Sequence, residues 1–188
     1  LKAYMQEIHK TGAKLFVQLT AGFGRSFAIT NPLVPFLKHR ALGALIKPVI
    51  DVSYICASPS ELPSRWAENV KCRAVTKKVI QKMIYAFAET SRLCKEAGVD
   101  GVEVHAVHEG YLLDQFTMPY TNKRTDEYGG SFENRYRFPV EIVKAIKAAC
   151  GDDFPVSLRY SVQSKTKDFC VGALPGETDY TEVGRNME

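Results

Sequence analysis

Short runs of apolar and β-branched residues occur at three places along the chain. The first, KLFVQLT at 14–20, follows a helix-like stretch that Gly12 closes, so it predicts a buried β-strand after a helix. Similar runs at 99–106 and 154–160 predict two further strands. The chain therefore carries at least three candidate strands, well separated in sequence.

Helical periodicity fills the intervals before the second and third strands. Residues 76–97 carry apolar side chains at three- and four-residue spacing, with Thr76 as the N-cap and Gly98 as the stop. Before the third strand, Ser131 predicts only a short helical turn. Pro139 is placed as the first residue of a separate helix that ends at Cys150.

The order strand, loop, helix predicts parallel βα units. The loops that follow the strands, at 21–70 and about 108–130, are long and rich in turn-forming residues, whereas the loops that precede the strands are short. This asymmetry is typical of a (β/α)8 TIM barrel, whose active site is built from loops at the carboxyl ends of the strands. A doubly wound open sheet remains an alternative, although no Gly-x-Gly-x-x-Gly follows a strand. Three strands cannot close a barrel of about 250 residues. We therefore expect residues 1–188 to be a fragment of one barrel domain.

Composition narrows the class of protein without defining its function. The chain is 45% hydrophobic and 24% charged, with a net charge of +4 from lysines and arginines spread among acids. This composition is ordinary for a soluble protein, and the mild net charge fits an anionic small ligand as well. Because no concentrated basic stripe and no apolar run of membrane-span length occur, we expect neither nucleic acid nor membrane as a partner. The N-terminus lacks signal-peptide features and an initiator Met, so we expect a cytoplasmic and processed or truncated chain. The five cysteines are far apart, which predicts reduced thiols rather than a metal or iron–sulfur site.

Polar side chains occur at the end of each predicted strand. Gln18, His105 and Arg159 occupy equivalent places on successive units, so a barrel would aim them into one pocket. An amide and a guanidinium suit a planar heterocycle, and arginine can stabilise negative charge on it. The alternative is that each is an ordinary hydrogen-bonded loop residue.

The segment 105–111, HAVHEGY, is the densest in candidate chemistry. His105, His108 and Tyr111 can supply hydrogen-bond donors to a carbonyl or carboxylate, together with a phenolic proton. A His-x-x-His zinc site is the rival, but no third ligand stands at a recognisable spacing, so we expect no metal. On spacing alone, histidines that only hydrogen-bond the loop remain an alternative.

Two longer motifs carry a family resemblance. The segment VDGVEVHAVHEGYLLDQF at 99–116 resembles the fourth-strand signature of the Old Yellow Enzyme family, and PYTNKRTDEYGGSFENR at 119–135 resembles the loop that follows it. The resemblance runs from about residue 5 to residue 161, which would place this chain at about strands 3 to 5 of the barrel. The Glu-Gly-Tyr form at 109–111 is similar to the 2-enoate and 2,4-dienoyl-CoA reductase branch.

The resemblance implies a cofactor and a role for each candidate. The family binds FMN in the barrel, and members of this branch also carry a 4Fe–4S cluster and a second flavin in a C-terminal region. Gln18 and Arg159 would hold the flavin, His105 and His108 would bind the substrate, and Tyr111 would donate a proton. The family usually has His or Asn directly before Gly-Tyr, whereas here Glu109 separates His108 from Gly110. The role of His108 is therefore the least defined of these.

The implied activity is reduction of the C=C bond of an α,β-unsaturated acid or thioester, with NAD(P)H as electron donor and hydride transfer from reduced FMN. A homo-oligomer is compatible with the sequence. The alternative function is an inactive barrel fragment that self-associates and binds no cofactor, because the flavin-phosphate loops of the family would lie outside this chain.

Overall fold

The computed structural model describes residues 1–27, 31–50, 52, 55–65, 67, 69–106 and 110–161. In chain order its elements are α1 (Lys2–Lys10), β1 (Phe16–Thr20), the 3-10 helices η1 (Gly24–Ser26) and η2 (Asn31–Leu33), α2 (Val34–Lys38), α3 (Arg40–Ile46), β2 (Ala57–Ser58), β3 (Arg73–Ala74), α4 (Lys77–Glu96), β4 (Gly101–His105), α5 (Leu112–Thr117), α6 (Phe132–Cys150) and β5 (Val156–Arg159).

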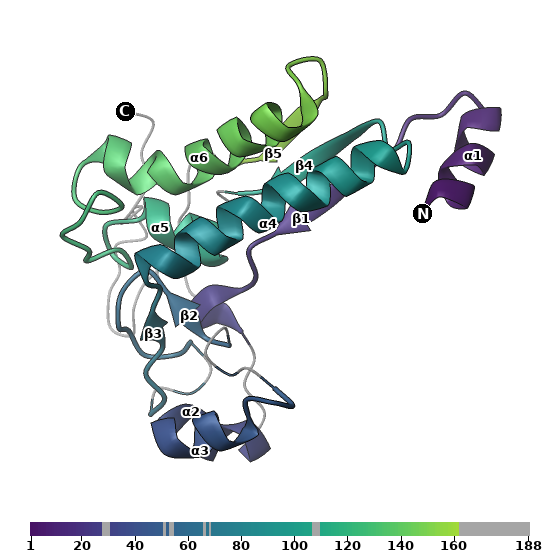
Figure 1. Cartoon of the computed structure of the whole chain (residues 1–188). Coiled ribbons are helices and arrows are strands. Elements are labelled where there is room, and N and C mark those ends of the chain that lie inside the picture. Colours follow the sequence, from purple (N-terminus) through teal and green to yellow (C-terminus); the bar gives the residue numbers. More distant parts are fainter. Residues whose placement is uncertain are drawn as a thin grey trace, which may run out of the picture.

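Strands β1, β4 and β5 form one parallel sheet in that order, which confirms the predicted strands and their direction. Helices α4 and α6 lie side by side along one face of the sheet (Figure 1). The side chains of Val17, Val102 and Val156 face this helical layer and belong to its core or pack against it. Because side chains alternate along a strand, the polar residue that follows each of these valines projects from the opposite face of the sheet.

The two long helices begin at side-chain caps. Thr76 accepts a hydrogen bond from the Val79 amide, so α4 starts one residue inside the predicted range. Ser131 caps α6 in the same way through the Asn134 amide. The prediction of a separate helix that starts at Pro139 is wrong, because α6 runs unbroken from Phe132 and Pro139 lies inside it.

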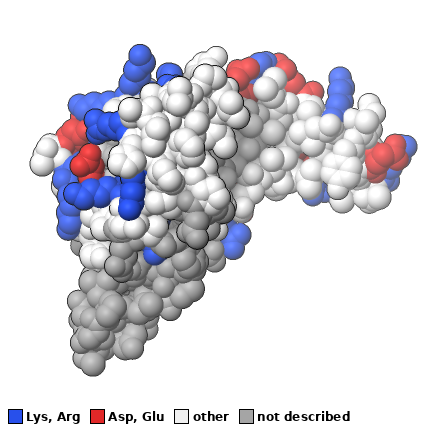
Figure 2. All heavy atoms as spheres, turned by 90° about the horizontal axis from the view of Figure 1, so that it is seen from below, with Lys and Arg blue, Asp and Glu red and all other residues white. Residues whose placement is uncertain are grey.

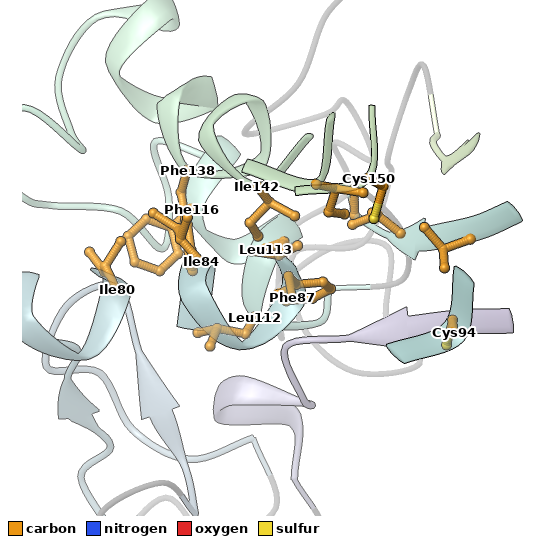
Figure 3. Packing of buried hydrophobic residues seen from close by; sticks show 14 of the residues in the cluster. Ile80, Ile84, Phe87, Cys94, Leu112, Leu113, Phe116, Phe138, Ile142 and Cys150 are labelled. Carbon is orange, nitrogen blue, oxygen red and sulfur yellow. The ribbon is translucent and has the colours of Figure 1, made fainter. Parts of the chain in front are cut away.

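The core lies between the two helices and the sheet (Figure 3). Helix α4 contributes Ile80, Ile84, Phe87 and Cys94, and helix α6 contributes Phe138, Ile142, Ile146 and Cys150. Residues three or four apart share one face of a helix, so each series forms a single apolar stripe. The short helix α5 closes one end of this core, where the rings of Phe116 and Phe138 meet edge to face with centroids 5.0 Å apart.

Residues 21–75, which we call the β1–α4 excursion, contain more regular structure than the expected irregular loop. The helices α2 and α3 lie at its far end, away from α4 and α6 (Figure 1). Strands β2 and β3 pair in parallel nearer the main sheet. Within the excursion, Leu37, Val52 and Val70 form a small separate core, against which apolar residues of α2 and α3 pack. The elements are too short to produce a periodic pattern, which is why the sequence did not reveal them.

Charged side chains on the face seen in Figure 2 lie in mixed groups of both signs towards its two ends, with largely uncharged surface between them. No helix within the described residues is long and apolar enough to cross a membrane. Four cysteines fall in the described part of the chain and all four are free thiols, as predicted: Cys56, Cys72, Cys94 and Cys150.

Candidate active site

The face of the sheet opposite α4 and α6, which we call the inner face, is lined by polar side chains. Gln18 stands in register with Glu103 and then Ser157, and Thr20 stands in register with His105 and then Arg159. In-register residues of parallel strands project to the same side, so these residues form two parallel rows. The second row lies at the carboxyl ends of the strands, where the long loops begin.

Gln18 lies one row below His105 and Arg159. The sequence placed it at the end of its strand, but β1 continues to Thr20. The Gln18 amide Nε2 donates a hydrogen bond to Glu103 Oε1 at 2.5 Å, and Ser157 Oγ lies 3.3 Å from Glu103 Oε2. The structure therefore places the Gln18 side chain in the row with Glu103 and Ser157, and not at the carboxyl edge of the sheet.

Glu103 is a functional candidate that the sequence reasoning missed. Its carboxylate joins three strands through Gln18 and Ser157, on a face where both partners are exposed. The available signal was the alternation in VEVH at 102–105, which places Glu103 on the same face as His105.

His105 and Arg159 are direct neighbours at the carboxyl edge of the sheet, in register on β4 and β5. His105 is buried, with 5% of its surface exposed, whereas the Arg159 side chain is exposed. The edge thus combines a buried imidazole with an exposed guanidinium.

Tyr111 lies over His105. Their ring centroids are 4.7 Å apart with 35° between the planes, and the ring of Phe23 meets Tyr111 edge to face at 4.7 Å. Tyr111 is also the N-cap residue of α5, whose first amide, that of Leu112, donates to the carbonyl of Gly22 at 3.1 Å. Loops that follow two different strands therefore fix the phenol ring above the histidine.

A buried polar network holds the backbone next to Tyr111. The Gly110 amide donates to Asp114 Oδ2 at 2.6 Å, and its carbonyl accepts from Ser26 Oγ at 3.0 Å and Gln115 Nε2 at 2.6 Å. Gln115 also accepts from the Arg25 amide at 3.1 Å. Asp114 and Gln115 are almost fully buried, so these bonds form in a low-dielectric interior. No pattern in the sequence indicated this supporting role.

The loop between α5 and α6 is fixed by charge-assisted hydrogen bonds. Arg124 binds Asp126 in a bidentate pair at 2.9 and 2.5 Å and also donates to the carbonyls of Pro59 and Val75. These hydrogen bonds from Arg124 hold the pKa of Asp126 below its usual value. Arg135 donates to two further loop carbonyls. These hydrogen bonds therefore give the loop a structural role.

One candidate lies outside the described residues. His108 belongs to the segment 107–109, so its predicted place beside His105 stays a prediction. Within the described residues, no group of three or more His, Cys, Asp or Glu side chains could hold a metal ion.

Parallel strands covered by helices on one face, with polar side chains under long loops at their carboxyl ends, define part of a (β/α)8 barrel. The structure is similar to Old Yellow Enzyme from a Pichia species, with a TM-score of 0.67 and 31% sequence identity over 88% of this chain and 40% of that one. Residues 1–176 match the model of the NADH:flavin oxidoreductase / NADH oxidase family, and the chain belongs to this family.

Two curated relatives cover most of the chain. A cinnamate reductase from Clostridium sporogenes is 46% identical over 97% of this chain and 24% of its own length. An NADH oxidase from Thermoanaerobacter brockii is 37% identical over 83% of this chain and 21% of its own length. The chain thus spans about a quarter or less of these relatives.

Proposed function

We propose that this chain is part of the FMN-binding barrel of an ene-reductase, and that it supplies residues that contact the flavin and the substrate. The substrate would be an α,β-unsaturated acid or thioester. The observation that carries the proposal is the ring contact of Tyr111 with His105 beside Arg159, at the carboxyl edge of an open polar inner face. Family membership and the similarity to a cinnamate reductase support the reaction class.

The donor set of the inner face fits a flavin. The Gln18 amide can both donate and accept, and the Arg159 guanidinium offers several donors, which together match the alternating carbonyl and N–H groups along a flavin ring edge. Both side chains are exposed on the same face of the sheet. Glu103, which accepts from the Gln18 amide, orients it for this contact.

Each residue at the carboxyl edge would have a separate task. Bound reduced FMN supplies the hydride for the β-carbon of the alkene. His105, with His108 beside it in our proposal, donates a hydrogen bond to the carboxylate or carbonyl oxygen of the substrate and so stabilises negative charge there. Tyr111 gives its phenolic proton to the α-carbon as the general acid. Burial of His105 under Tyr111 keeps water from competing for that hydrogen bond.

The electron donor and the additional cofactors are also part of the proposal. NAD(P)H would reduce the flavin, in keeping with the family and with the NADH oxidase relative. A 4Fe–4S cluster and a second flavin would be held by parts of the protein outside this chain, which spans 24% of the cinnamate reductase.

Activity of the full-length protein tests the proposal. We expect purified protein to show the absorbance of bound FMN and to oxidise NAD(P)H anaerobically only when a 2-enoate is present, with the saturated acid as product. Comparison of the free acid with its thioester identifies the substrate class. Absence of flavin, or NAD(P)H oxidation without alkene reduction, would refute the proposed function.

A further inference from the structure

Two buried cysteines lie side by side in the β1–α4 excursion. Cys56 immediately precedes β2 and Cys72 immediately precedes β3. The parallel register pairs Ala57 with Arg73, so the preceding residues, Cys56 and Cys72, stand opposite each other. They are 2% and 1% exposed, and both thiols are reduced.

Their geometry needs little change for a disulfide bond. The two thiols lie near enough for each to shift the pKa of the other. Adjacent strands are about 4.8 Å apart, and a disulfide tolerates Cα separations of roughly 4.4–6.8 Å. The backbone of both residues is fixed, because the Arg73 amide donates to the Cys56 carbonyl at 3.2 Å and the Cys72 amide donates to the Leu62 carbonyl at 2.8 Å.

The two thiols are chemically unequal. The hydrogen bond from Cys72 lowers the pKa of Cys56 despite its burial, and Ser64 adds to this effect. The pKa of Cys72 is raised by the same hydrogen bond and by burial. Cys56 is therefore the thiol that more readily forms the attacking thiolate, which the Cys72 S–H stabilises as a hydrogen-bond donor. Cys72 also lines a surface cavity of about 390 Å³ between α2 and β3, so the residue beside Cys56 stands at the wall of a space that a small molecule can enter.

The other described thiols provide a comparison within the same chain. Cys94 and Cys150 lie in the core between α4 and α6, and burial raises the pKa of each. Cys150 adds to the raised pKa of Cys94, and neither thiol has its pKa lowered by a hydrogen bond. Buried thiols of this kind are usually inert.

We propose that Cys56 and Cys72 form a reversible dithiol–disulfide site that is oxidised by hydrogen peroxide. The Cys56 thiolate attacks one peroxide oxygen, the O–O bond breaks and, with a proton, water leaves, which gives a sulfenic acid. The Cys72 sulfur then attacks the Cys56 sulfur, the S–O bond breaks and a second water leaves. The two thiols lose two electrons and two protons, and the peroxide is reduced to two waters.

The disulfide would reduce the mobility of the hydrogen-bonded residues that hold the loop at Tyr111. Pro63, between the two cysteines, accepts from Arg25 Nε at 3.1 Å, and the Arg25 amide donates to Gln115 at 3.1 Å. Gln115 in turn holds the Gly110 carbonyl next to Tyr111. A disulfide between Cys56 and Cys72 would therefore restrict the motion of Pro63, and through Arg25 and Gln115 that of the backbone next to Tyr111.

Peptide mapping of the full-length protein tests this site. Reduced protein is freed of reductant, treated with stepwise hydrogen peroxide, alkylated and digested with trypsin. Cleavage after Arg65 and Lys71 puts the two cysteines in separate peptides. We expect these peptides to become linked, with loss of the mass of two hydrogen atoms, and to separate again with a dithiol reductant. At the same peroxide dose Cys94 and Cys150 should remain open to alkylation after denaturation.

Single substitutions test the order of the steps. Cys72→Ser should accumulate a sulfenic acid on Cys56 that a cyclic dione traps, whereas Cys56→Ser should leave Cys72 as a thiol. The proposal fails if both cysteines of the wild-type protein stay alkylatable, if they oxidise further without becoming linked, or if Cys94 and Cys150 become linked at the same dose. The wild-type mapping decides the question even if a variant does not fold.

Discussion

At the scale of single residues, the backbone on either side of Tyr111 determines where its ring lies. Gly24 shows how tightly this region is packed. Its φ is +60°, and a Cβ at this position would lie 2.4 Å from Gln115 Oε1. Gln115 cannot move aside without losing its hydrogen bonds to the Arg25 amide and to the carbonyls of Phe23 and Gly110.

Replacement of Gly24 should therefore be costly. We expect Gly24→Ala to destabilise the protein by roughly 2–5 kcal/mol, since the left-handed backbone costs about 1–2 kcal/mol and the overpacking about 1–3 kcal/mol. Gly22→Ala is the matched control, because Gly22 has φ +92° but nothing within 4 Å of its would-be Cβ, so only the backbone cost of about 1–2 kcal/mol applies. Thermal unfolding measures both variants. Equal losses would show that the contact with Gln115 is unimportant.

The candidate residues could be predicted from the sequence more readily than their surroundings. The alternation of strands placed His105 and Arg159 at carboxyl ends, and the structure puts them next to each other. The predicted strand 14–20 ends at Thr20, as β1 does, but the pattern did not indicate that Thr20 rather than Gln18 stands in register with His105. Nor could local patterns reveal the role of Gln115, because its partners Phe23 and Arg25 lie about ninety residues away in sequence.

At the scale of elements, long periodic helices and apolar strands were predictable, whereas their boundaries depended on tertiary contacts. Proline lacks the amide that would bond to the carbonyl four residues earlier, so Pro139 favours a helix start. In α6 the buried stripe of Phe138, Ile142 and Ile146 continues across that position. Burial of this stripe outweighs the one missing hydrogen bond, and the helix continues through the proline.

The loop before α6 gives a prediction about pH. Because the pair with Arg124 lowers the pKa of Asp126, the ionised carboxylate stabilises the fold above the ordinary aspartate pKa of about 3.9. This stabilisation is lost as the pH falls through the lower folded pKa. We expect Asp126→Asn to lower the unfolding temperature at neutral pH, with the difference from wild type shrinking below about pH 4. The exposed Asp153→Asn is the control. A difference that stays constant at all pH values would rule out this role of the pair.

At the scale of the whole molecule, the sheet is open. Among the described residues, β1 and β5 each pair with β4 alone, so each leaves one edge unpaired. Apolar side chains such as Phe16, Leu158 and Tyr160 are more than 40% exposed on or beside these edge strands. Unpaired edges and exposed apolar surface favour association.

The 188-residue chain on its own should therefore behave differently from the full-length protein. We predict that it binds FMN weakly or not at all, because it carries only part of the contacts to the cofactor, and that it self-associates. Quenching of FMN fluorescence measures the first property and light scattering measures the second. A monodisperse monomer with submicromolar affinity for FMN would show that these strands form a complete cofactor site.

The central claim is that Tyr111, held above His105 at the carboxyl edge of the sheet, protonates the alkene. Its most direct test is rapid-mixing absorbance of the full-length protein, wild type and Tyr111→Phe, with each half of the reaction followed separately. The phenylalanine keeps the ring contacts but removes the proton. We predict that NAD(P)H reduces the flavin at an unchanged rate, while reoxidation by the 2-enoate slows by about 100- to 10,000-fold. Reoxidation at the wild-type rate would contradict the assignment of Tyr111 as the proton donor.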